Sequence, residues 1–406
     1  MPEEFLICQH CLADNELRTE VIERGTPVEF CAICKALGGR ALSASDPRVK
    51  RIFRALVRLN FSEWDYNDHV GGDSLWSQIL GSKAIFSFGT DASMDEFEQA
   101  FLTMEDSWYP ATDDEITLGG GHWDGGILLG LRDARDTRVE QIIGACFTHN
   151  CFDVIPQAKT LVDSLRGDIT STIEAGTEYF RSRIGFKERY IREDAFQFRN
   201  PRYYAAYTGS EIDRPPLTKA TEGRLNRPRV SVLYLASDME TAVSELRPHP
   251  GHLISTARFR TNRDLMVANF GSQDIRNFLN DERLEVLRTI LSFSDVLNMP
   301  VQPDQKELYV VTQTFADAIR ESGFDAVTFR SSLGPGINLT CFSSDAFEMV
   351  PDSESVQEVT SLTYKIIDAR KLPATYEPGE YKEVKNDPLS MTIHGMAPRP
   401  SAGPLG

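Results

Sequence analysis

"EGRLNRPRVSVLYLASDMETAVSE", residues 222–245, contains a glycine–arginine pair, an apolar run and the start of a helix. The run RVSVLYLAS is apolar on both faces, which is typical of a buried strand. Ser237 and Glu240 have the spacing of a capping box, so we expect the strand to end at Ala236 and a helix to begin immediately after it. The stretch therefore predicts one buried strand followed directly by a helix.

The predicted helix places a carboxylate at the edge of its apolar face. By the helical period, Glu245 lies on the flank of the stripe that would be buried, which comprises Met239, Ala242, Val243 and Leu246. A carboxylate in this position is near the core without being fully buried, as a cleft-facing group would be. Taken singly, Glu245 is an ordinary helix residue, Arg224 an ordinary surface arginine and Tyr234 an ordinary core residue. Only their occurrence together indicates a site.

Around this stretch, from about residue 175 onward, short apolar runs alternate with helical periodicity. Further strands are predicted at LISTARFR (253–260), LMVANF (265–270), LYVV (308–311) and DAVTF (325–329). Helices are predicted at DERLEVLRTILSF (281–293) and TFADAIRESG (314–323), the second with Gly323 as its C-terminal stop. The pattern predicts an α+β domain.

The first residues contain two C-x2-C pairs, Cys8 with Cys11 and Cys31 with Cys34, separated by 19 residues. This spacing is typical of a four-thiolate zinc site, in which each pair forms one knuckle. Two redox-active pairs are the alternative, but a redox motif needs a single pair beside a βαβ unit. Four thiolates leave no open coordination position, so we expect the Zn2+ to be structural.

The region from about 45 to 165 is predicted to be mostly helical. Its first helix would have Asp46 as N-cap and Pro47 as first residue, with a stripe formed by Val49, Ile52, Phe53 and Leu56. The later segment TRVEQIIGACF (137–147) has a similar stripe. Between them, LGGGHWDGG (118–126) is interpreted as a loop, since it lacks the context of a phosphate-binding motif. In CFTHNC (146–151) a metal site is conceivable, but packing of Cys146 in the core is favoured.

Composition and charge limit the classes of function. With 43 Lys and Arg against 60 Asp and Glu, the formal net charge of the 406 residues is −17, which gives no general attraction to nucleic acid or to anionic membranes. No signal-like start or long apolar run occurs, so we expect a cytoplasmic protein. Seven dispersed cysteines favour free thiols or metal ligands over disulfides.

Several ordered segments of the C-terminal half resemble one known family. YFRSRIG (179–185) matches an aromatic-Arg-x-Arg pattern, and residues 222–245 match Gly-Arg-x-Asn, Leu-Tyr-Leu, Thr-Ala and Glu. GFDAVTFRSSLGPGINLTCF (323–342) matches Gly-x-Asp, a strand, Ser-Ser and Gly-x-Asn. Together they resemble the RES domain, named for an arginine, a glutamate and a serine. The N-terminal part resembles the zinc-plus-helical, HEPN-like region that accompanies some RES domains.

The sequence departs from the RES pattern at a few positions. The family usually has Asn-Pro-x-Gly after the glycine–arginine pair, where this chain has the residues Asn226 to Arg229. Ala326 stands where glycine is common, and Phe329 where tyrosine is common. These differences affect expected loop shape more than chemistry. The segment RPHPGH (247–252) has the Arg-x4-His spacing of HEPN ribonucleases, but it lies in the wrong domain and is broken by prolines, so the helical region is expected to be catalytically empty.

The resemblance implies an ADP-ribosyltransferase-like fold and cleavage of the nicotinamide–ribose bond of NAD+. RES proteins pass ADP-ribose to phosphate, to water or to a protein. Departure of nicotinamide leaves an oxocarbenium-like ribose, so such a site needs a nearby carboxylate, a clamp for the pyrophosphate and a wall against water. We expect Glu245 to be the carboxylate whose loss reduces turnover most.

The remaining site residues follow from the same resemblance. Arg181, with Glu245 and Ser331, would be catalytic. The guanidinium groups of Arg181 and Arg224 would hold the pyrophosphate, because guanidinium makes bidentate contacts to anionic oxygens. Ser331 would orient the nicotinamide ribose or carboxamide, with Ser332 as the alternative if the register slips. Tyr234 would stack on nicotinamide, and the other expected NAD+-binding residues are Arg183 and Asn338.

The sequence thus predicts four regions. These are a four-cysteine zinc module (1–42), a helical HEPN-like domain (43–168), a RES catalytic domain (172–372) and a flexible tail (373–406), where Pro and Gly are dense. The leading hypothesis is an NAD+-consuming toxin or defence effector with phosphate as a candidate co-substrate and an antitoxin or inhibitor protein as a candidate partner. The alternatives are an ADP-ribosyltransferase and a non-enzymatic zinc-containing interaction protein. A homo-oligomer is left open.

Overall fold

The computed structural model describes residues 6–61, 63–65, 73–75, 79–80, 84–89, 92–98, 116–118, 130–131, 134–192, 201–280, 282–299, 301, 305–343, 345–363, 366 and 375. Their contacts divide the chain into two compact units. Unit 1 comprises Met1–Asp136 and Asp274–Leu291, and unit 2 comprises Thr137–Gln273 and Ser292–Gly406. Almost all of the expected tail and most of the glycine-rich loop lie outside the described residues.

Unit 1 begins with a small antiparallel sheet of order β1-β3-β2 and two helices. Helix α2 begins where the sequence predicted, because the Asp46 side chain accepts the N–H groups of Arg48 and Val49. The predicted apolar stripe of this helix is buried. The elements are β1 (Leu6–Cys8), η1 (Gln9–Cys11), α1 (Asn15–Arg24), β2 (Thr26–Pro27), β3 (Arg40–Ser43) and α2 (Pro47–Asn60).

A second three-stranded sheet in unit 1 has the order β4-β6-β5, formed by β4 (Glu63–Asp65), β5 (Asp73–Ser74) and β6 (Ile116–Leu118). The segment 274–291 contributes η4 (Ile275–Asn277) and the first residues of α9 (Leu284–Asn298). Arg276 of this segment is within 2.7 Å of a Glu23 carboxylate oxygen and within 3.6 Å of buried Glu20. Residues distant in sequence therefore complete this unit.

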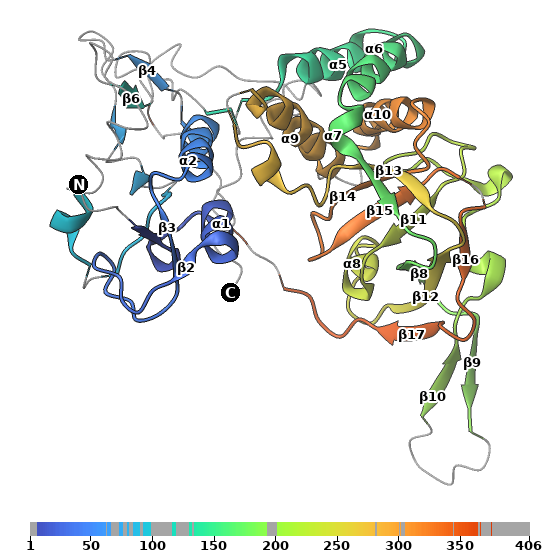
Figure 1. The fold of residues 1–406 in the computed structure, drawn as a ribbon. Helices are drawn as coiled ribbons and strands as arrows, with labels where there is room; N and C mark the ends of the chain where they lie inside the picture. The colour runs from blue at the N-terminus through green and yellow to red at the C-terminus, as the bar shows by residue number, and fades with distance from the viewer. Residues whose placement is uncertain are drawn as a thin grey trace. The chain divides into compact units, whose positions relative to one another are not determined.

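A nine-stranded mixed sheet forms the centre of the described part of unit 2 (Figure 1). Its order is β16-β12-β8-β11-β15-β14-β13-β7, and β17 also pairs with β12; within it, only β13 and β14 pair in parallel. The strands are β7 (Thr170–Ile173), β8 (Glu178–Ile184), β11 (Leu233–Ala236), β12 (Leu253–Thr261), β13 (Leu265–Asn269), β14 (Ala326–Arg330), β15 (Ile337–Cys341), β16 (Phe347–Met349) and β17 (Ser355–Glu358). The fold is α+β, as predicted.

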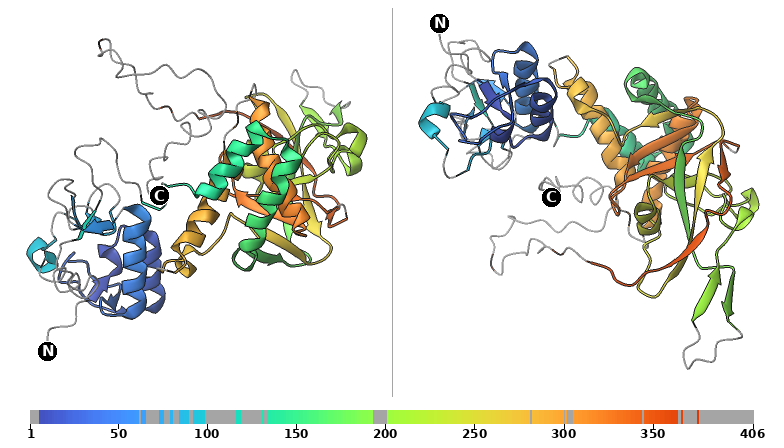
Figure 2. Two further views of the ribbon diagram at one scale, coloured as in Figure 1. Left: turned by 90° about the horizontal axis from the view of Figure 1, so that it is seen from above. Right: turned by 60° about the horizontal axis from the view of Figure 1, so that its bottom comes forward.

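Helices of unit 2 pack beside this sheet, and α6 runs along α10 (Figure 2). They are α5 (Thr137–Thr148), α6 (Cys151–Ser164), α7 (Arg166–Ile169), α8 (Met239–Ser244) and α10 (Tyr309–Glu321), with the short turns η2 (Gly209–Glu211), η3 (Leu217–Lys219) and η5 (Lys306–Leu308). Gly323 follows α10 with a φ of 84°, as expected for a helix stop. The apolar stripe predicted for 137–147 is buried apart from half-buried Phe147, and it includes Cys146.

The strand predicted at LYVV is wrong, because these residues belong to η5 and the start of α10. The buried side chains continue at helical spacing through Leu308, Val311, Phe315 and Ile319. A run of four apolar residues fits either period, and only the longer pattern distinguishes them. The other predicted strands and helices are present with shifts at their ends.

Strands β9 (Glu188–Ile191) and β10 (Arg202–Ala205) form a separate antiparallel pair that extends from the main sheet (Figure 1). The contacts also place α5 and α6 in unit 2 and the segment 274–291 in unit 1. From the sequence, both helices were expected in the N-terminal region and the segment 274–291 in the C-terminal domain. Each unit is therefore built from two segments that are separated in the sequence.

Candidate functional site

A cavity of about 880 Å³ lies in unit 2, toward the upper end of the usual range for pockets that bind small molecules and cofactors. Residues of β8, β11, α8, β15 and the turns before β11 and α10 line it. Six of the expected site residues are in its wall: Arg181, Arg183, Arg224, Tyr234, Glu245 and Asn338. The sequence motifs therefore converge on one space.

Glu245 caps the C-terminal end of α8 and is half-buried. Its Oε1 accepts a hydrogen bond of 2.7 Å from the Ser331 hydroxyl and one of 2.7 Å from the Asn338 side-chain amide. No hydrogen bond to Oε2 is formed by the residues that the structure describes. The carboxylate is thus oriented by one oxygen, while the other is available to a ligand.

The Ser331 hydroxyl lies in a turn whose glycines allow close approach to α8. A Cβ on Gly336 would lie 1.9 Å from Asp238 Oδ2, and one on Gly334 would lie 2.7 Å from the Thr241 Cα. Within the turn, the Ser331 Oγ accepts the N–H groups of Leu333 and Gly334. Close packing of this turn against the start of α8 places Ser331 against Glu245.

The two adjacent serines have different surroundings. The Ser331 hydroxyl contacts Glu245, whereas the Ser332 Oγ is buried and has no hydrogen-bond partner among the described residues. Neither serine is among the residues that line the cavity. Ser331, and not Ser332, therefore contacts the Glu245 carboxylate, from outside the set of residues that line the cavity.

Arg181, on β8, is fixed by three backbone carbonyl groups. Its guanidinium donates to the carbonyl oxygens of Ile212, Tyr234 and Asp213, the last two at 2.9 and 3.4 Å. Burial lowers the pKa of Arg181 to about 10, so the group stays positively charged at neutral pH. These bonds leave part of its five-donor guanidinium free to bind an anion.

Arg224 and Tyr234 are held by one loop. The Tyr234 hydroxyl donates to Asn226 Oδ1 at 2.7 Å and accepts the Leu225 N–H at 3.0 Å. A Cβ on Gly223 would lie 2.8 Å from this hydroxyl, which explains the glycine before Arg224. Burial also raises the pKa of Tyr234, which keeps its hydroxyl protonated.

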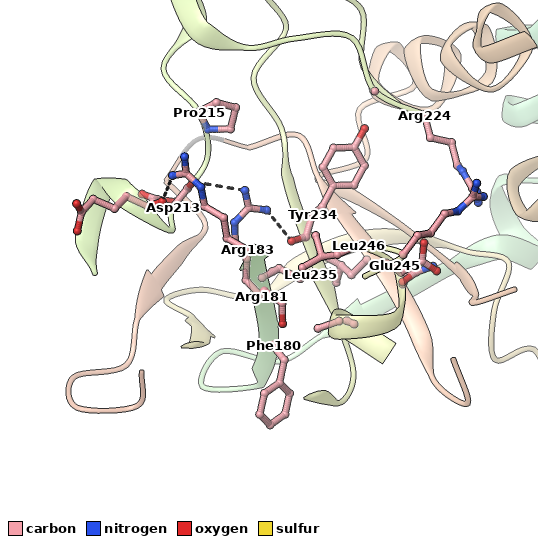
Figure 3. A pocket seen from close by; sticks show the side chains of 18 of the residues that line it. Phe180, Arg181, Arg183, Asp213, Pro215, Arg224, Tyr234, Leu235, Glu245 and Leu246 are labelled. Atoms are coloured by element: carbon pink, nitrogen blue, oxygen red, sulfur yellow. Dashed lines mark hydrogen bonds between the residues drawn. The ribbon is translucent and has the colours of Figure 1, made fainter. Parts of the chain in front are cut away.

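Arg183 is exposed at the cavity wall. Its guanidinium donates to the Glu211 carbonyl oxygen and stacks over the Tyr207 ring, with 4.8 Å between the Cζ and the ring centroid. Figure 3 shows Arg181 and Arg183 on one side of Tyr234, and Arg224 and Glu245 on the other. The cavity thus has two groups of cationic side chains.

The capping prediction for α8 is wrong in one respect. The strand ends at Ala236 as expected, but the N-cap is Asp238, whose Oδ1 accepts the Thr241 N–H at 2.8 Å. The Ser237 Oγ instead accepts the Ile337 N–H. Met239, predicted to be buried, is 42% exposed, and Thr241 takes its place in the core. Aspartate and serine are equally good caps, and here the Ser237 hydroxyl is occupied by the Ile337 N–H, which leaves the capping position to Asp238.

Sequence reasoning missed several cavity residues: Lys219, Arg247, Lys306 and Tyr309. Lys219 and Lys306 come from turns without a recognisable motif. The sequence motifs include Arg247 only through its Arg-x4-His spacing to His252, which indicates no role in this cavity. A φ above zero at a non-glycine residue would have indicated Arg247, but the sequence does not reveal backbone angles.

The departures from the RES pattern have specific outcomes. Arg229, at the usual glycine position, has a φ of 65° and so adopts the conformation that glycine tolerates best. Ala326 is buried in β14, and Phe329 lines the cavity. Arg229 therefore places a side chain in a backbone conformation that costs free energy.

The four N-terminal cysteines lie together in unit 1. Their Sγ atoms are all within 4.8 Å of one another, and the Cys11 and Cys31 Sγ atoms are 3.6 Å apart. A tetrahedral Zn2+ with bonds near 2.3 Å requires sulfur atoms about 3.8 Å apart. The His10 N–H also points to the Cys8 Sγ at 3.4 Å. This donor set fits zinc.

The fold and the cavity are those of an α+β protein with a site suited to an anionic ligand. Residues 192–364 match the model of the RES domain family. A solved structure described as the M. tuberculosis MbcT–MbcA toxin–antitoxin complex is similar at 13% sequence identity and a TM-score of 0.28, over 50% of this chain and 92% of that chain. No curated protein matches the sequence.

None of the helices in the described part of the chain combines the length and the apolar character needed to cross a bilayer.

Proposed function

We propose that this protein cleaves the nicotinamide–ribose bond of NAD+. The observation that carries the proposal is the placement of Glu245, which Ser331 and Asn338 orient in the wall of a cavity that also presents Arg181 and Arg224. The match of residues 192–364 to the RES domain family supports the same chemistry. An oriented carboxylate and fixed guanidinium groups in one cavity are the groups that this chemistry requires.

The proposed roles follow from charge. The free oxygen of Glu245 stabilises the positive charge that develops on the ribose, or binds its hydroxyl groups. Arg181, with Arg183 beside it, and Arg224 on the other side of Tyr234 bind the pyrophosphate. Tyr234 contributes an aromatic wall for the nicotinamide, and Asn338 acts through Glu245. Ser331 acts as a positioning residue for the carboxylate.

The bond between the nicotinamide nitrogen and ribose C1′ breaks with its electron pair, which stays on nicotinamide. An oxygen of phosphate or water then forms the new bond to C1′ and loses its proton to solvent. The products are nicotinamide and ADP-ribose 1″-phosphate, or ADP-ribose. Uncontrolled turnover would deplete NAD+, so we propose a toxin or defence effector that acts in the cytoplasm and is restrained by an inhibitor protein.

The test is nicotinamide release by the purified full-length protein, with and without phosphate, followed by mass spectrometry of the ribosyl product. Glu245→Gln is expected to lower kcat by about a hundredfold or more, since it removes the charge that acts in the transition state. Glu240→Gln is the control, because Glu240 is exposed on the same helix and outside the cavity wall. Equal activity of both variants would contradict the proposal.

The same assay separates the alternatives. With labelled NAD+, an ADP-ribosyltransferase leaves the label on a macromolecule, whereas phosphorolysis or hydrolysis leaves it in a small product. A non-enzymatic interaction protein releases no nicotinamide at all.

We also propose that Cys8, Cys11, Cys31 and Cys34 bind one structural Zn2+. Metal analysis of the purified protein should find about one zinc per chain, and Cys31→Ser should lower both the zinc content and the melting temperature. Cys151→Ser is a matched control, since Cys151 lies outside this cluster. Loss of zinc in both variants, or in neither, would contradict the assignment.

A further inference from the structure

The cavity contains more positive than negative side chains. Three carboxylates are in its wall, at Glu211, Asp213 and Glu245, against six cationic residues: Arg181, Arg183, Lys219, Arg224, Arg247 and Lys306. Among the residues that the structure describes, none of these six forms an ion pair with a carboxylate. NAD+ carries two negative phosphates and one positive pyridinium ring, so one pyrophosphate clamp does not account for all six.

Arg247 has an unusual backbone conformation. Its φ is 48°, in the left-handed region that costs free energy for any residue with a side chain. Its N–H closes the end of α8 on the Ser244 carbonyl at 2.9 Å. Glycine is the usual residue for such a turn. Strained residues of this kind are concentrated at functional sites, which makes the Arg247 side chain a candidate for a role in binding.

Arg247 and Arg224 are anchored in the same way. The Arg247 Nη1 donates to the Val301 carbonyl oxygen at 3.0 Å, and the Arg224 Nη1 donates to the Leu297 carbonyl oxygen at 3.2 Å. Both acceptors belong to the last turn of α9 or the residues after it. Each contact uses one of the five guanidinium N–H donors, so most donors of both groups remain available. The contacts hold both groups in place, which reduces the entropy cost of binding.

The two arginines also lie near the proposed catalytic carboxylate. Arg247 is two residues beyond Glu245 in the chain, and both line the cavity. Arg224 and Glu245 lie on the same side of Tyr234, away from Arg181 and Arg183 (Figure 3). An anion bound by Arg224 and Arg247 would therefore sit on the Glu245 side of the cavity.

We propose that Arg224 and Arg247 form a phosphoryl-binding subsite beside Glu245, distinct from the Arg181 side. This rests on the proposed function and adds Arg247 to the site. Two anchored guanidinium groups bind a phosphoryl group through paired N–H contacts to its oxygens. The phosphoryl group comes either from the dinucleotide itself or from free inorganic phosphate.

The experiment measures nicotinamide release by full-length Arg247→Gln, Arg247→Lys and the control Arg229→Gln. Arg229 is exposed and has a φ of 65°, so it shares the unusual backbone conformation of Arg247, but it is not in the cavity wall. Arg247→Gln is expected to raise the KM for NAD+ or the KM for phosphate by about tenfold to a hundredfold, the usual effect of losing a charge-assisted hydrogen bond. Arg247→Lys should recover only part of this, because lysine cannot make a paired contact.

Separate titrations identify the source of the phosphoryl group. A raised KM for phosphate with an unchanged KM for NAD+ assigns the subsite to the acceptor, and the reverse assigns it to the dinucleotide. Unchanged kinetics in Arg247→Gln, or equal losses in Arg229→Gln, would overturn the subsite.

Calorimetry with inorganic pyrophosphate and with inorganic phosphate provides a readout independent of turnover. The wild-type protein should bind at least one of them more tightly than Arg247→Gln by about tenfold. If the wild-type protein releases no nicotinamide but shows this difference, the proposed function fails and the subsite stands. If nicotinamide is released but neither KM nor binding changes in the variant, the subsite fails alone.

Discussion

Glu245, Ser331 and Asn338 are far apart along the chain, with separations of 86 and 93 positions from Glu245, yet their side chains form one hydrogen-bonded group. The sequence motifs identified all three residues but left Ser331 and Ser332 as alternatives. Side-chain direction decides between them, since neighbouring residues after a strand face different ways. A motif specifies residue types in order, whereas the contact depends on the turn that follows β14.

Replacing Ser331 and Ser332 separately tests this contact. Ser331→Ala removes a donor to Glu245 and the acceptor for two backbone N–H groups, so we expect a loss of about 1–2 kcal/mol in unfolding free energy and at least about tenfold in kcat. Ser332→Ala removes a buried hydroxyl without a partner among the described residues and should change stability by less than about 0.5 kcal/mol, or increase it. Denaturant unfolding and nicotinamide release are the measurements. Similar losses in both variants would show that Ser331 has no special role.

A second prediction at this scale concerns Asp325, which precedes β14. The Arg263 guanidinium lowers the Asp325 pKa to about 2, with help from the Ser343 hydroxyl and the Met266 N–H. Because the folded pKa is below the unfolded value near 3.8, Asp325 stabilises the fold above about pH 4, and this contribution is lost as the pH falls toward 2. The contribution is roughly 2 kcal/mol at neutral pH.

Asp325→Asn should therefore be less stable than wild type at pH 7, and the difference should shrink at pH 2.5. Asp352→Asn is the control, because Asp352 is exposed and asparagine tolerates its φ of 55°. Urea unfolding at both pH values is the measurement. A difference of the same size at pH 7 and pH 2.5 would rule out this origin of the stability.

At the scale of elements, long periodic patterns predicted the structure better than short ones. The apolar stripe of α2 extends over enough residues to define one period. LYVV is too short for this, and the start of α8 was misassigned because Ser237 and Asp238 are both good caps. The loop 334–336 determines which residue caps α8, because the Ile337 N–H that follows the loop donates to the Ser237 hydroxyl. That loop is remote in sequence, so no local pattern contains it.

The glycine turn after β14 is predicted to be as important to activity as the residues that it positions. Gly336→Ala places a Cβ within 1.9 Å of Asp238 Oδ2 and 2.3 Å of Ser237 Oγ, so the turn must move and Ser331 with it. We expect a loss of about 1–3 kcal/mol in stability and a marked fall in kcat. Gly167→Ala is the control, because its Cβ would meet nothing within 4 Å and alanine favours the helix α7. Thermal unfolding and nicotinamide release should separate the two variants, and equal behaviour would contradict this role of the turn.

At the scale of the whole molecule, the sequence does not show which segments belong to which of the two compact units. Periodicity identified helices at 137–147 and 281–293 but could not show which core each helix joins. Contacts place α5 and α6 with the sheet of unit 2, and the segment 274–291 in unit 1. Leu284, Leu287 and Ile290 of that segment are fully or almost fully buried. Because the chain passes three times between the units, a single cut cannot release either of them intact.

This division predicts how truncated proteins behave. A fragment beginning at residue 170 lacks α6, and so it exposes the side of α10 that α6 covers. Each buried apolar side chain contributes about 1.5–3 kcal/mol, so several of them equal the stability of a typical domain. A fragment beginning at Thr137 keeps α6 and has the same loss of unit 1 as the shorter fragment.

Comparing these two fragments therefore isolates the contribution of α5 and α6. We expect the fragment from Thr137 to be the more soluble of the two and to unfold cooperatively, and the fragment from residue 170 to aggregate or to lack a thermal transition. If both fragments unfold with the same midpoint, the two helices are not part of the core of unit 2. Activity lost only in the shorter fragment would reflect a damaged core, so the effect of residues 1–136 on nicotinamide release is measured by comparing full-length protein with the fragment from Thr137.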